Sequence, residues 1–407
     1  MRSLFFSKGA ALVVLGISML LNITPFDRGV IVGDFQPQEY AGIQLHPLSS
    51  SRDILVEDVF FPSHGEMCHA WLYTTKKQAV EETGNDEEVA ENINSNENDD
   101  PKRPVVVMAP GLGTQKDMGL DRYAQRFVQA GFVVFMFDYR NFGASTGTPR
   151  NFVSPRRHIQ DYHAALDFLL QRSATTTTTM SLSEKVDTSR IALWGTSFSG
   201  GHVLEVAAAR PQDIMGVVSQ VPHLSGKVAA VKGIKKRGVV KTLRLALAAL
   251  QDQARSVIGR PPVCVKIISS SPDELAIMDV TPEDYARYLE KQPPQPLGGW
   301  RNQVPARMLL EIRFYNPLDT LKKKKKKTAS VQDAGDKTGS SQQLPPVLFI
   351  GSTLDDLCPP GLIEEASHLA PSSKLILRDG THFQIYEPQH WMEVADEMVK
   401  FYDSCWN

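Results

Sequence analysis

The feature that most constrains how this chain can fold is a series of short, predominantly apolar runs separated by segments with helical periodicity. A strand covered on both faces of a sheet is apolar at nearly every position, whereas a half-buried strand alternates. Predominantly apolar runs occur at residues 104–109, 132–137, 190–194, 214–221, 346–350 and 374–377. Helical patterns occur at residues 120–129, 154–170, 198–209 and 390–406, and the first and last of these are amphipathic. Strands that alternate with helices in this order predict an α/β fold with a mostly parallel central sheet and helices on both faces.

Two further segments extend the predicted sheet, and one long gap interrupts it. Residues 54–61 and 67–74 alternate between apolar and polar positions, which predicts an antiparallel pair at the start of the core. The gap after the fourth apolar run breaks the alternation of strands and helices. We therefore expect a core made of residues 52–222 and 344–407, with a helical lid inserted at residues 223–321.

Low-complexity stretches divide the core and end the lid. Residues 78–103 are acidic and rich in asparagine, and residues 173–183 contain a threonine run. Residues 322–343 begin with the lysine run Lys322–Lys327. All three lack apolar residues to bury, so we expect disordered, exposed insertions. The lysines lack interleaved aromatic residues, which favours a solvated loop over a nucleic-acid or acidic-lipid site.

The N-terminus resembles a targeting segment. A basic start with Arg2 and Lys8 precedes an uncharged stretch from Gly9 to Leu21. This length suits a signal-peptide core and is short for a membrane-spanning helix. Residues 1–26 are therefore a predicted signal peptide or signal anchor, with a buried N-terminal helix as the alternative. The prediction places the protein in the secretory pathway or on a membrane, with a cytoplasmic face or an organelle also compatible.

Composition excludes several classes of partner. The formal net charge of -2 gives no overall attraction to nucleic acid. The cysteines show neither Cys-x-x-Cys spacing nor histidines at metal spacing, so no zinc site is expected. They can form two disulfides or remain four free thiols, and their spacing favours neither: Cys68, Cys264, Cys358 and Cys405. The sequence indicates no oligomeric state.

The third apolar run leads into a candidate nucleophile. Gly195-Thr196-Ser197-Phe198-Ser199-Gly200 follows this predicted strand and precedes a helical pattern. A serine on such a tight strand-to-helix turn projects its hydroxyl from the carboxyl edge of the sheet. Residues two positions away must be small, because the strand and the helix nearly touch. Gly195 meets this requirement, and Ser199 stands where glycine is usual but is small enough to fit.

A serine hydroxyl needs a base, and the base needs a group that orients it. Asp355 and Asp356 follow the fifth apolar run, and His382 follows the sixth. The order serine, acid, histidine is that of the strand–turn–helix hydrolases. Asp355 is the predicted acid from its spacing to the following proline, with Asp356 as the competitor.

Other histidines are weaker candidates for the base. His368 and His390 lie in helical patterns that leave them at the surface, and His202 lies on the helix after the serine. His382 is therefore the predicted base. Two backbone N–H groups are expected to stabilise the oxyanion, from Phe198 and from Leu112 in the Pro110-Gly111-Leu112-Gly113 turn.

These motifs resemble the α/β-hydrolase superfamily. The segments that carry the resemblance are MAPGLG at 108–113, FDYRNFGAS at 137–145, ALWGTSFSGG at 192–201, GSTLDDLCPP at 351–360 and GTHFQIY at 380–386. The chain is similar to the group of serine aminopeptidase or lysophospholipase-like hydrolases, over roughly residues 54–402. Bacterial and fungal hydrolases with GTSFSGGHV and a GRPPV lid segment, here Gly259–Val263, are the nearest likeness.

The resemblance implies an α/β-hydrolase fold that cleaves a small-molecule ester, thioester or amide through an acyl-enzyme, without a metal ion or organic cofactor. A carboxylic ester or thioester is the expected substrate. A serine aminopeptidase-like peptidase or an acyltransferase on the same triad is an alternative, and a non-catalytic binding protein with the same fold is another.

The predicted lid contains one strongly biased segment, residues 227–260. Basic residues are interleaved there with an apolar set: Val240, Leu243, Leu247, Leu250 and Ile258. One interpretation is a helix whose apolar face meets an acyl chain while its basic face meets acidic lipid. The favoured interpretation is a helix that packs its apolar face on the body and leaves its lysines solvated.

Overall fold

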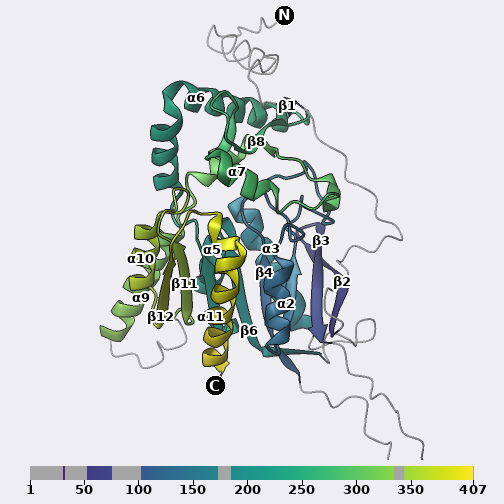
Figure 1. Ribbon diagram of the computed structural model, residues 1–407, viewed down its shortest axis with the longest axis vertical. Helices are drawn as coiled ribbons and strands as arrows, with labels where there is room; N and C mark the ends of the chain where they lie inside the picture. The colour runs from purple at the N-terminus through teal and green to yellow at the C-terminus, as the bar shows by residue number, and fades with distance from the viewer. Residues whose placement is uncertain (1–30, 33–52, 76–101, 173–184, 334–342, 407) are drawn as a thin grey trace, which may run out of the picture.

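The computed structural model describes residues 31–32, 53–75, 102–172, 185–333 and 343–406 (Figure 1). Its centre is an eight-stranded sheet in the order β12-β11-β7-β6-β4-β5-β3-β2. The strands are β2 (Ile54–Ser63), β3 (Glu66–Thr75), β4 (Arg103–Ala109), β5 (Val133–Phe137), β6 (Val186–Thr196), β7 (Gly216–Gln220), β11 (Val347–Ser352) and β12 (Ser373–Arg378). The six strands from β12 to β5 are parallel, while β3 pairs antiparallel with β5 and with β2. The predicted mostly parallel sheet and its antiparallel opening pair are confirmed.

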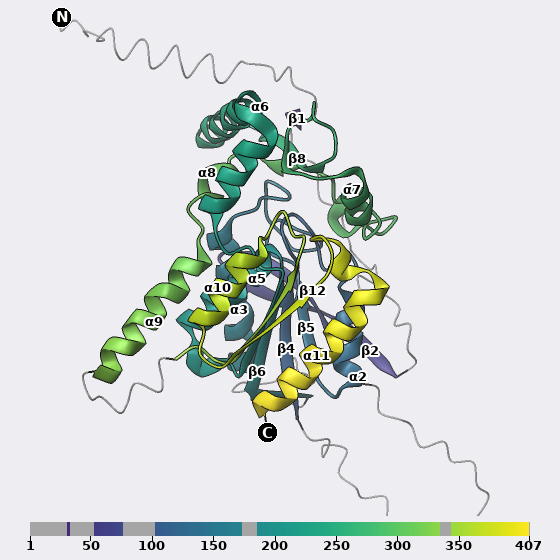
Figure 2. The ribbon, with the colours of Figure 1, turned by 60° about the vertical axis from the view of Figure 1, so that its left-hand side comes forward.

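Helices cover both faces of this sheet (Figure 2). On one face lie α2 (Asp121–Gln129) and α11 (Pro388–Trp406), which also contact each other. On the other lie α3 (Pro155–Arg172), α5 (Phe198–Ala209) and α10 (Pro360–Leu369). Among the described residues, short 3₁₀ turns lie in the core at Pro211–Asp213 and Gln384–Tyr386, and another lies between β7 and β11 at Leu297–Gly299.

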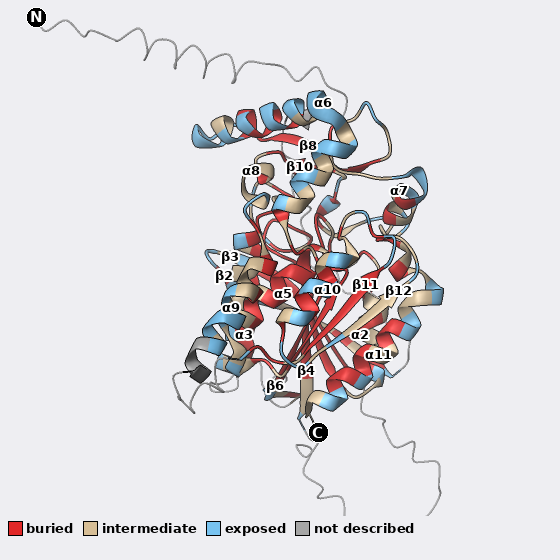
Figure 3. Cartoon of the chain, turned by 90° about the vertical axis from the view of Figure 1, so that its left-hand side faces the viewer, coloured by how far each residue is buried: buried red, intermediate tan, exposed pale blue. Residues whose placement is uncertain are grey.

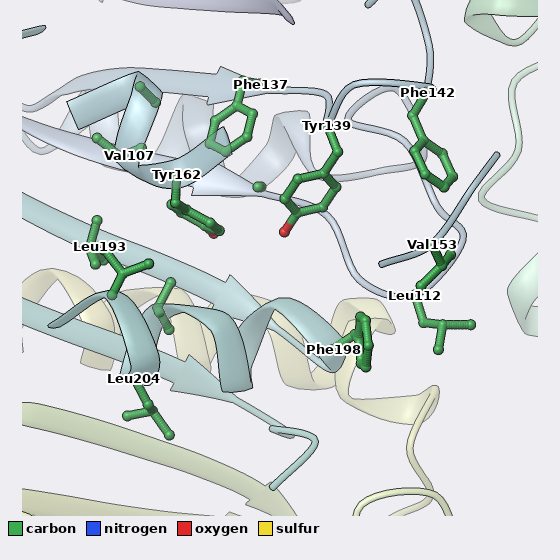
Figure 4. Packing of buried hydrophobic residues seen from close by; sticks show 14 of the residues in the cluster. Val107, Leu112, Phe137, Tyr139, Phe142, Val153, Tyr162, Leu193, Phe198 and Leu204 are labelled. Carbon is green, nitrogen blue, oxygen red and sulfur yellow. The ribbon is translucent and has the colours of Figure 1, made fainter. Parts of the chain in front are cut away.

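Strand β4 shows why the apolar runs are continuous. Val105 and Val107 belong to the cluster that packs against α3 and α5, whereas Val106 and Met108 belong to the cluster that packs against α2 and α11. Successive side chains of a strand point to opposite faces, so two covered faces require apolar residues throughout. Figure 4 shows one of these clusters, in which Phe137, Tyr162 and Leu193 pack between sheet and helix.

The segment between β7 and β11 leaves the sheet at its carboxyl edge and lies above it (Figure 1). We call residues 226–316 the inserted segment. It contains α6 (Gly226–Val257), β8 (Val263–Ser269), β9 (Ala276–Asp279), α7 (Pro282–Leu289), β10 (Val304–Pro305) and α8 (Met308–Ile312). Strand β8 pairs with β9, β10 and the short β1 (Ile31–Val32). The prediction of a helical lid at residues 223–321 does not include this small sheet, because β1, β9 and β10 are only two to four residues long and depend on β8 for their hydrogen bonds.

The lysine run does not form the disordered, exposed insertion that its composition predicts. Lys322–Lys327 lie within α9 (Pro317–Asp333), which packs against α5 and α10. Lysine is a good helix former, and the buried Leu318 and Leu321 attach the helix to the core. Lys324 Nζ donates to the Ala208 carbonyl at 2.9 Å. The run is therefore part of a packed helix rather than a loop.

Several predictions fall outside the described residues. These are the targeting segment 1–26, most of the acidic stretch, the threonine run and residues 334–342; Arg103 already begins β4. Within the described ranges, none of the helices combines the length and apolarity needed to span a bilayer. Cys68, Cys264, Cys358 and Cys405 form no disulfide in the described part of the chain.

Candidate active site

Ser197 occupies the turn between β6 and α5. Its backbone angles, φ 56° and ψ −117°, belong neither to the strand nor to the helix. Two backbone hydrogen bonds fix the turn: Ser197 N–H donates to Gln220 O, and His223 N–H donates to Ser197 O, both at 2.8 Å. Such a conformation is costly for a non-glycine residue and persists only where the surroundings impose it.

Close packing around the turn explains its small residues. A Cβ added to Gly195 would lie 2.4 Å from the Ser199 carbonyl oxygen, which is closer than real Cβ contacts. Ser199 itself is fully buried, and its Oγ lies 2.7 Å from the Tyr162 hydroxyl. The serine therefore fits in place of the usual glycine because its hydroxyl has a partner inside the core.

His382 lies between Ser197 and Asp355. Its Nε2 is 3.0 Å from Ser197 Oγ, and its Nδ1 is 2.6 Å from Asp355 Oδ2. Because the carboxylate can only accept, Nδ1 carries the proton and Nε2 is left to accept the serine proton. His382 and Asp355 are both 3% exposed, so water does not compete for these hydrogen bonds. The structure thus brings together the three side chains that the sequence singles out.

The two adjacent aspartates occupy different environments. Asp355 Oδ1 accepts the backbone N–H groups of Leu357 and Cys358 at 2.8 and 2.7 Å, which aims the other oxygen at His382. The Asp356 side chain is 68% exposed and pairs with Lys236 at 3.1 Å and Lys232 at 3.4 Å. Asp355, and not Asp356, contacts the histidine.

The competing histidines lie elsewhere. His202 is buried on α5, with its Nδ1 2.7 Å from the Tyr315 hydroxyl. His368 is exposed on α10, and His390 is partly exposed on α11. Of these candidates, His382 is the one whose ring contacts the Ser197 hydroxyl.

The loop after β4 is held beside the serine. A Cβ at Gly111 would lie 3.2 Å from Ser197 Cβ, so the loop backbone passes very close to the turn. Further along the same loop, Lys116 N–H donates to Asp138 Oδ1 at 2.8 Å, and Lys116 Nζ forms a buried ion pair with Asp138 at 2.5 Å. Asp138 belongs to the FDYRNFGAS segment, which therefore serves to anchor the loop that carries Leu112.

Two cavities meet at the serine, and both are lined by Leu112, Ser197 and Met278. The larger, about 420 Å³, extends beneath α6. Its apolar walls include Ile277, Ile312 and Leu357, and its basic wall is formed by Lys232, Lys235, Lys236 and Arg237. The smaller, about 50 Å³, lies on the side of His382, Phe383 and Tyr386.

His223 is a site residue that sequence reasoning missed. It follows β7, the strand beside the serine-bearing strand, and it lines the larger cavity next to Phe198. Burial lowers the pKa of His223 to about 4, with a smaller effect from the nearby His382, so the ring is neutral near pH 7. A histidine just past a parallel strand is a signal that the sequence does contain, because all such strand ends meet at one edge.

One group of side chains has metal-ligand chemistry. Ligand atoms of Asp355, Cys358 and His382 lie within 4.8 Å of one another. The hydrogen bonds described above already use both carboxylate oxygens and His382 Nδ1. Burial, and to a smaller degree Asp355, raises the pKa of the Cys358 thiol well above its usual value, which opposes the thiolate that a metal would need. The donors fit an acid–base pair better than a metal centre.

Comparisons with known proteins identify the family and the fold of the chain. Residues 100–282 match the family model described as serine aminopeptidase, S33. The chain is 31% identical over 345 residues to the quorum-quenching protein AidA of Acinetobacter baumannii, which covers 84% of this chain and 93% of the relative. It is 32% identical over 178 residues to a thiohydrolase of Arthrinium phaeospermum, covering 44% of this chain and 52% of that protein. A polyketide transferase of Aspergillus fumigatus is 32% identical over 165 residues, covering 40% of this chain and 49% of the relative.

Solved structures share the fold. The structure of DcsB in complex with its substrate analogue superposes with a TM-score of 0.61 at 20% identity, covering 86% of this chain and 99% of that one. The α/β hydrolase GrgF from Penicillium sp. sh18 gives a TM-score of 0.59 at 19% identity, covering 86% and 98%. At these identities the likeness concerns the fold alone.

Proposed function

Because the chain belongs to the α/β-hydrolase superfamily, we propose that it is a serine hydrolase in which Ser197 is the nucleophile, His382 the general base and Asp355 the orienting acid. The observation that carries the proposal is the His382 ring, hydrogen-bonded to Ser197 through one nitrogen and to Asp355 through the other. A neutral imidazole held in this tautomer can take the serine proton at the moment of attack.

The reaction would proceed in two steps. Ser197 Oγ attacks the substrate carbonyl carbon while its proton moves to His382 Nε2, and Asp355 stabilises the imidazolium. When the bond to the leaving group breaks, the imidazolium protonates the departing alcohol or thiol, which leaves an acyl group on Ser197. Water then attacks this acyl group with His382 again as the base, releasing the acid and restoring the serine.

Two backbone donors would stabilise the oxyanion. Phe198 is the first residue of α5, where the N–H has no partner within the helix. Leu112 follows Gly111, whose close approach to Ser197 places that stretch of backbone at the reaction centre. Donors fixed before the reaction stabilise the developing charge without reorganisation, which is a large part of catalysis in such sites.

The substrate we propose is a carboxylic ester or thioester with a substantial acyl part. The larger cavity offers room for it, with apolar walls close to the serine. The similarity to a thiohydrolase supports a thioester among the candidates. A serine aminopeptidase-like activity on a peptide is the alternative suggested by the family model.

Acyl transfer is a second candidate function. The smaller cavity also reaches Ser197 and is lined by His382, so an acceptor alcohol or amine lying there could replace water in the second step. The similarity to a polyketide transferase favours this possibility. Analysis of the products formed with and without an added acceptor separates the two: a transferase yields the acylated acceptor, whereas a hydrolase yields the free acid.

A fluorophosphonate probe tests the nucleophile directly. Wild-type protein should be labelled at Ser197, and Ser197→Ala should lose labelling together with turnover of p-nitrophenyl esters, by a factor on the order of a millionfold. Ser199→Gly is the matched control, because it changes a neighbouring serine that bonds to Tyr162 and should retain labelling. Unlabelled, folded wild-type protein would instead favour a non-catalytic binding protein on this fold.

A further inference from the structure

The outer surface of α6 is apolar. Val240, Leu243, Leu247 and Leu250 are 67%, 59%, 55% and 48% exposed, and their spacing places them on one side of the helix. Val239 and Val257 extend the same side and are 65% and 75% exposed. Most of this helix is drawn as exposed or intermediate in Figure 3, at the end of the molecule remote from the base of the sheet. We call these six residues the α6 apolar face.

Two basic residues of α6, which flank its kink at Gly238, are turned towards the protein. Arg237 and Lys241 form ion pairs with Asp279 on β9, and their side chains are only 14% and 13% exposed. The inner side of the second half of α6 is completed by Leu245, Ala248 and Asp252, which are buried. The expectation that the apolar set packs on the body is wrong: Val240, Leu243, Leu247, Leu250 and Ile258 are exposed, whereas Leu245 and Ala248 fill the inner side. Lysines of the same helix are solvated as expected, for example Lys235 and Lys236.

An apolar row of this length on a monomer indicates a surface that becomes covered. Exposed basic residues lie around it, namely Lys235, Arg244 and Arg260. The segment from Gly226 to Arg260 contains Asp252 as its single acidic residue, and that carboxylate is buried against Arg307. The surroundings of the α6 apolar face are therefore positively charged.

The N-terminal part of the chain enters the fold at the same place. Strand β1 pairs with β8, the strand on which α6 packs. The sequence that precedes β1 contains the uncharged, apolar stretch from Gly9 to Leu21. Strand β1 is thus the described element nearest in sequence to this stretch, and it belongs to the same small sheet as β8.

We propose that the α6 apolar face docks on the surface of an anionic lipid bilayer. A helix that presents apolar residues to the acyl-chain boundary, with cations at its margins, has the pattern of an interfacial membrane-binding element. A second copy fits less well, because a two-fold contact through this face would bring the basic margins of both copies together. The proposal does not depend on the role of Ser197.

Flotation with lipid vesicles tests the proposal on the full-length chain. Vesicles of phosphatidylcholine with about 30% phosphatidylserine should carry the protein, and vesicles of phosphatidylcholine alone should carry less of it. The triple variant Leu243→Gln, Leu247→Gln, Leu250→Gln should lower the partition coefficient by on the order of a hundredfold, because three apolar side chains leave the interface. Met392→Gln is the matched control: it changes an exposed apolar residue on α11 and should leave vesicle binding unchanged.

Two further measurements separate this proposal from the proposed function. The triple variant should keep the wild-type rate on a water-soluble ester without vesicles, since none of its three sites lines either cavity. Ser197→Ala should bind vesicles like the wild type even though its activity is lost. Equal vesicle binding by the triple variant and the wild type would overturn the proposal, as would a full-length chain that binds no vesicles. Light scattering that shows a dimer, broken by the triple variant, would assign the face to a second copy instead.

Discussion

Helices α5 and α6 both begin where the chain leaves a strand of the central sheet, yet they treat their apolar residues in opposite ways. Nearly all of α5 is buried, and its glycines allow contacts that a side chain would block: a Cβ at Gly201 would lie 2.3 Å from the His223 carbonyl oxygen. In α6 the leucines and valines of one side face outward, while Arg237 and Lys241 pair with Asp279 on the inner side. Steric requirements between neighbouring residues determine how α5 packs on the strand that precedes it. Which side of an amphipathic helix such as α6 faces the protein depends instead on the residues of other segments that it contacts.

The largest expected effect concerns the acid of the site. Asp355→Asn should lower kcat by about 10⁴-fold, because an amide no longer holds His382 in the tautomer that accepts the serine proton. Asp356→Asn, which loses only exposed ion pairs with α6, should change kcat by less than about tenfold. Ester hydrolysis by the two purified variants measures both effects. Equal losses in the two variants would show that the geometry misidentifies the acid.

Next in size is the steric cost at the start of α5. Gly195→Ala should lower the free energy of unfolding by about 3 kcal/mol or more, because its Cβ would meet the Ser199 backbone at 2.4 Å. Gly361→Ala on α10 meets nothing within 4 Å and should instead leave stability unchanged or raise it by up to about 1 kcal/mol. Urea unfolding compares the two. A Gly195→Ala protein as stable as the wild type would mean that the strand and helix are not in close contact there.

Substitutions on the two sides of α6 should change the free energy of unfolding by different amounts. Leu245→Ala empties a buried position on the inner side and should lower the free energy of unfolding by about 2–3 kcal/mol. Leu243→Gln changes a residue that is 59% exposed and should alter stability by less than about 0.5 kcal/mol. Thermal or urea unfolding distinguishes these values. The reverse ranking would mean that the apolar face of α6 is packed in solution.

The smallest effect is a change in pH dependence at His223. Burial lowers the pKa of His223 to about 4 in the folded protein, whereas an unfolded histidine titrates near 6.5. Between these values the unfolded chain binds more protons, so the free energy of unfolding decreases as the pH falls from 6.5 towards 4. His223→Gln should reduce this slope by roughly one proton, or about 1.4 kcal/mol per pH unit. The other titrating groups are shared by both proteins, so identical slopes in urea unfolding at pH 4.5 to 7 would contradict the buried, neutral state.

Much of the core could be predicted because its signals are local or periodic. Apolar runs such as residues 104–109 must be buried on both faces, so they identify the parallel strands without knowledge of their partners. The serine turn is recognisable because steric crowding restricts a few adjacent residues, and the site residues follow strands whose carboxyl ends share one edge. His223 also follows a parallel strand, so the same reasoning could have identified it as a site residue.

The strands of the inserted segment could not be predicted from the sequence. Strands β1 and β10 are two residues long, and each depends on β8 for its hydrogen bonds. The lysine run has the composition of a loop, yet it forms a helix because two neighbouring leucines attach it to the surfaces of α5 and α10. In both cases the stabilising partners are distant in the sequence and leave no periodic pattern.

The amino-acid sequence by itself determined the succession of strands and helices along the α/β core, the tight turn at Ser197 and the order in which serine, acid and histidine occur. These properties follow from backbone sterics and from the burial of both faces of a sheet, which act on neighbouring residues. Only the tertiary structure decided between Asp355 and Asp356, placed His223 beside the serine, and turned the leucines of α6 outward. Each of these outcomes depends on which remote side chains meet, since hydrogen bonds and ion pairs between distant segments exist only once the chain has folded.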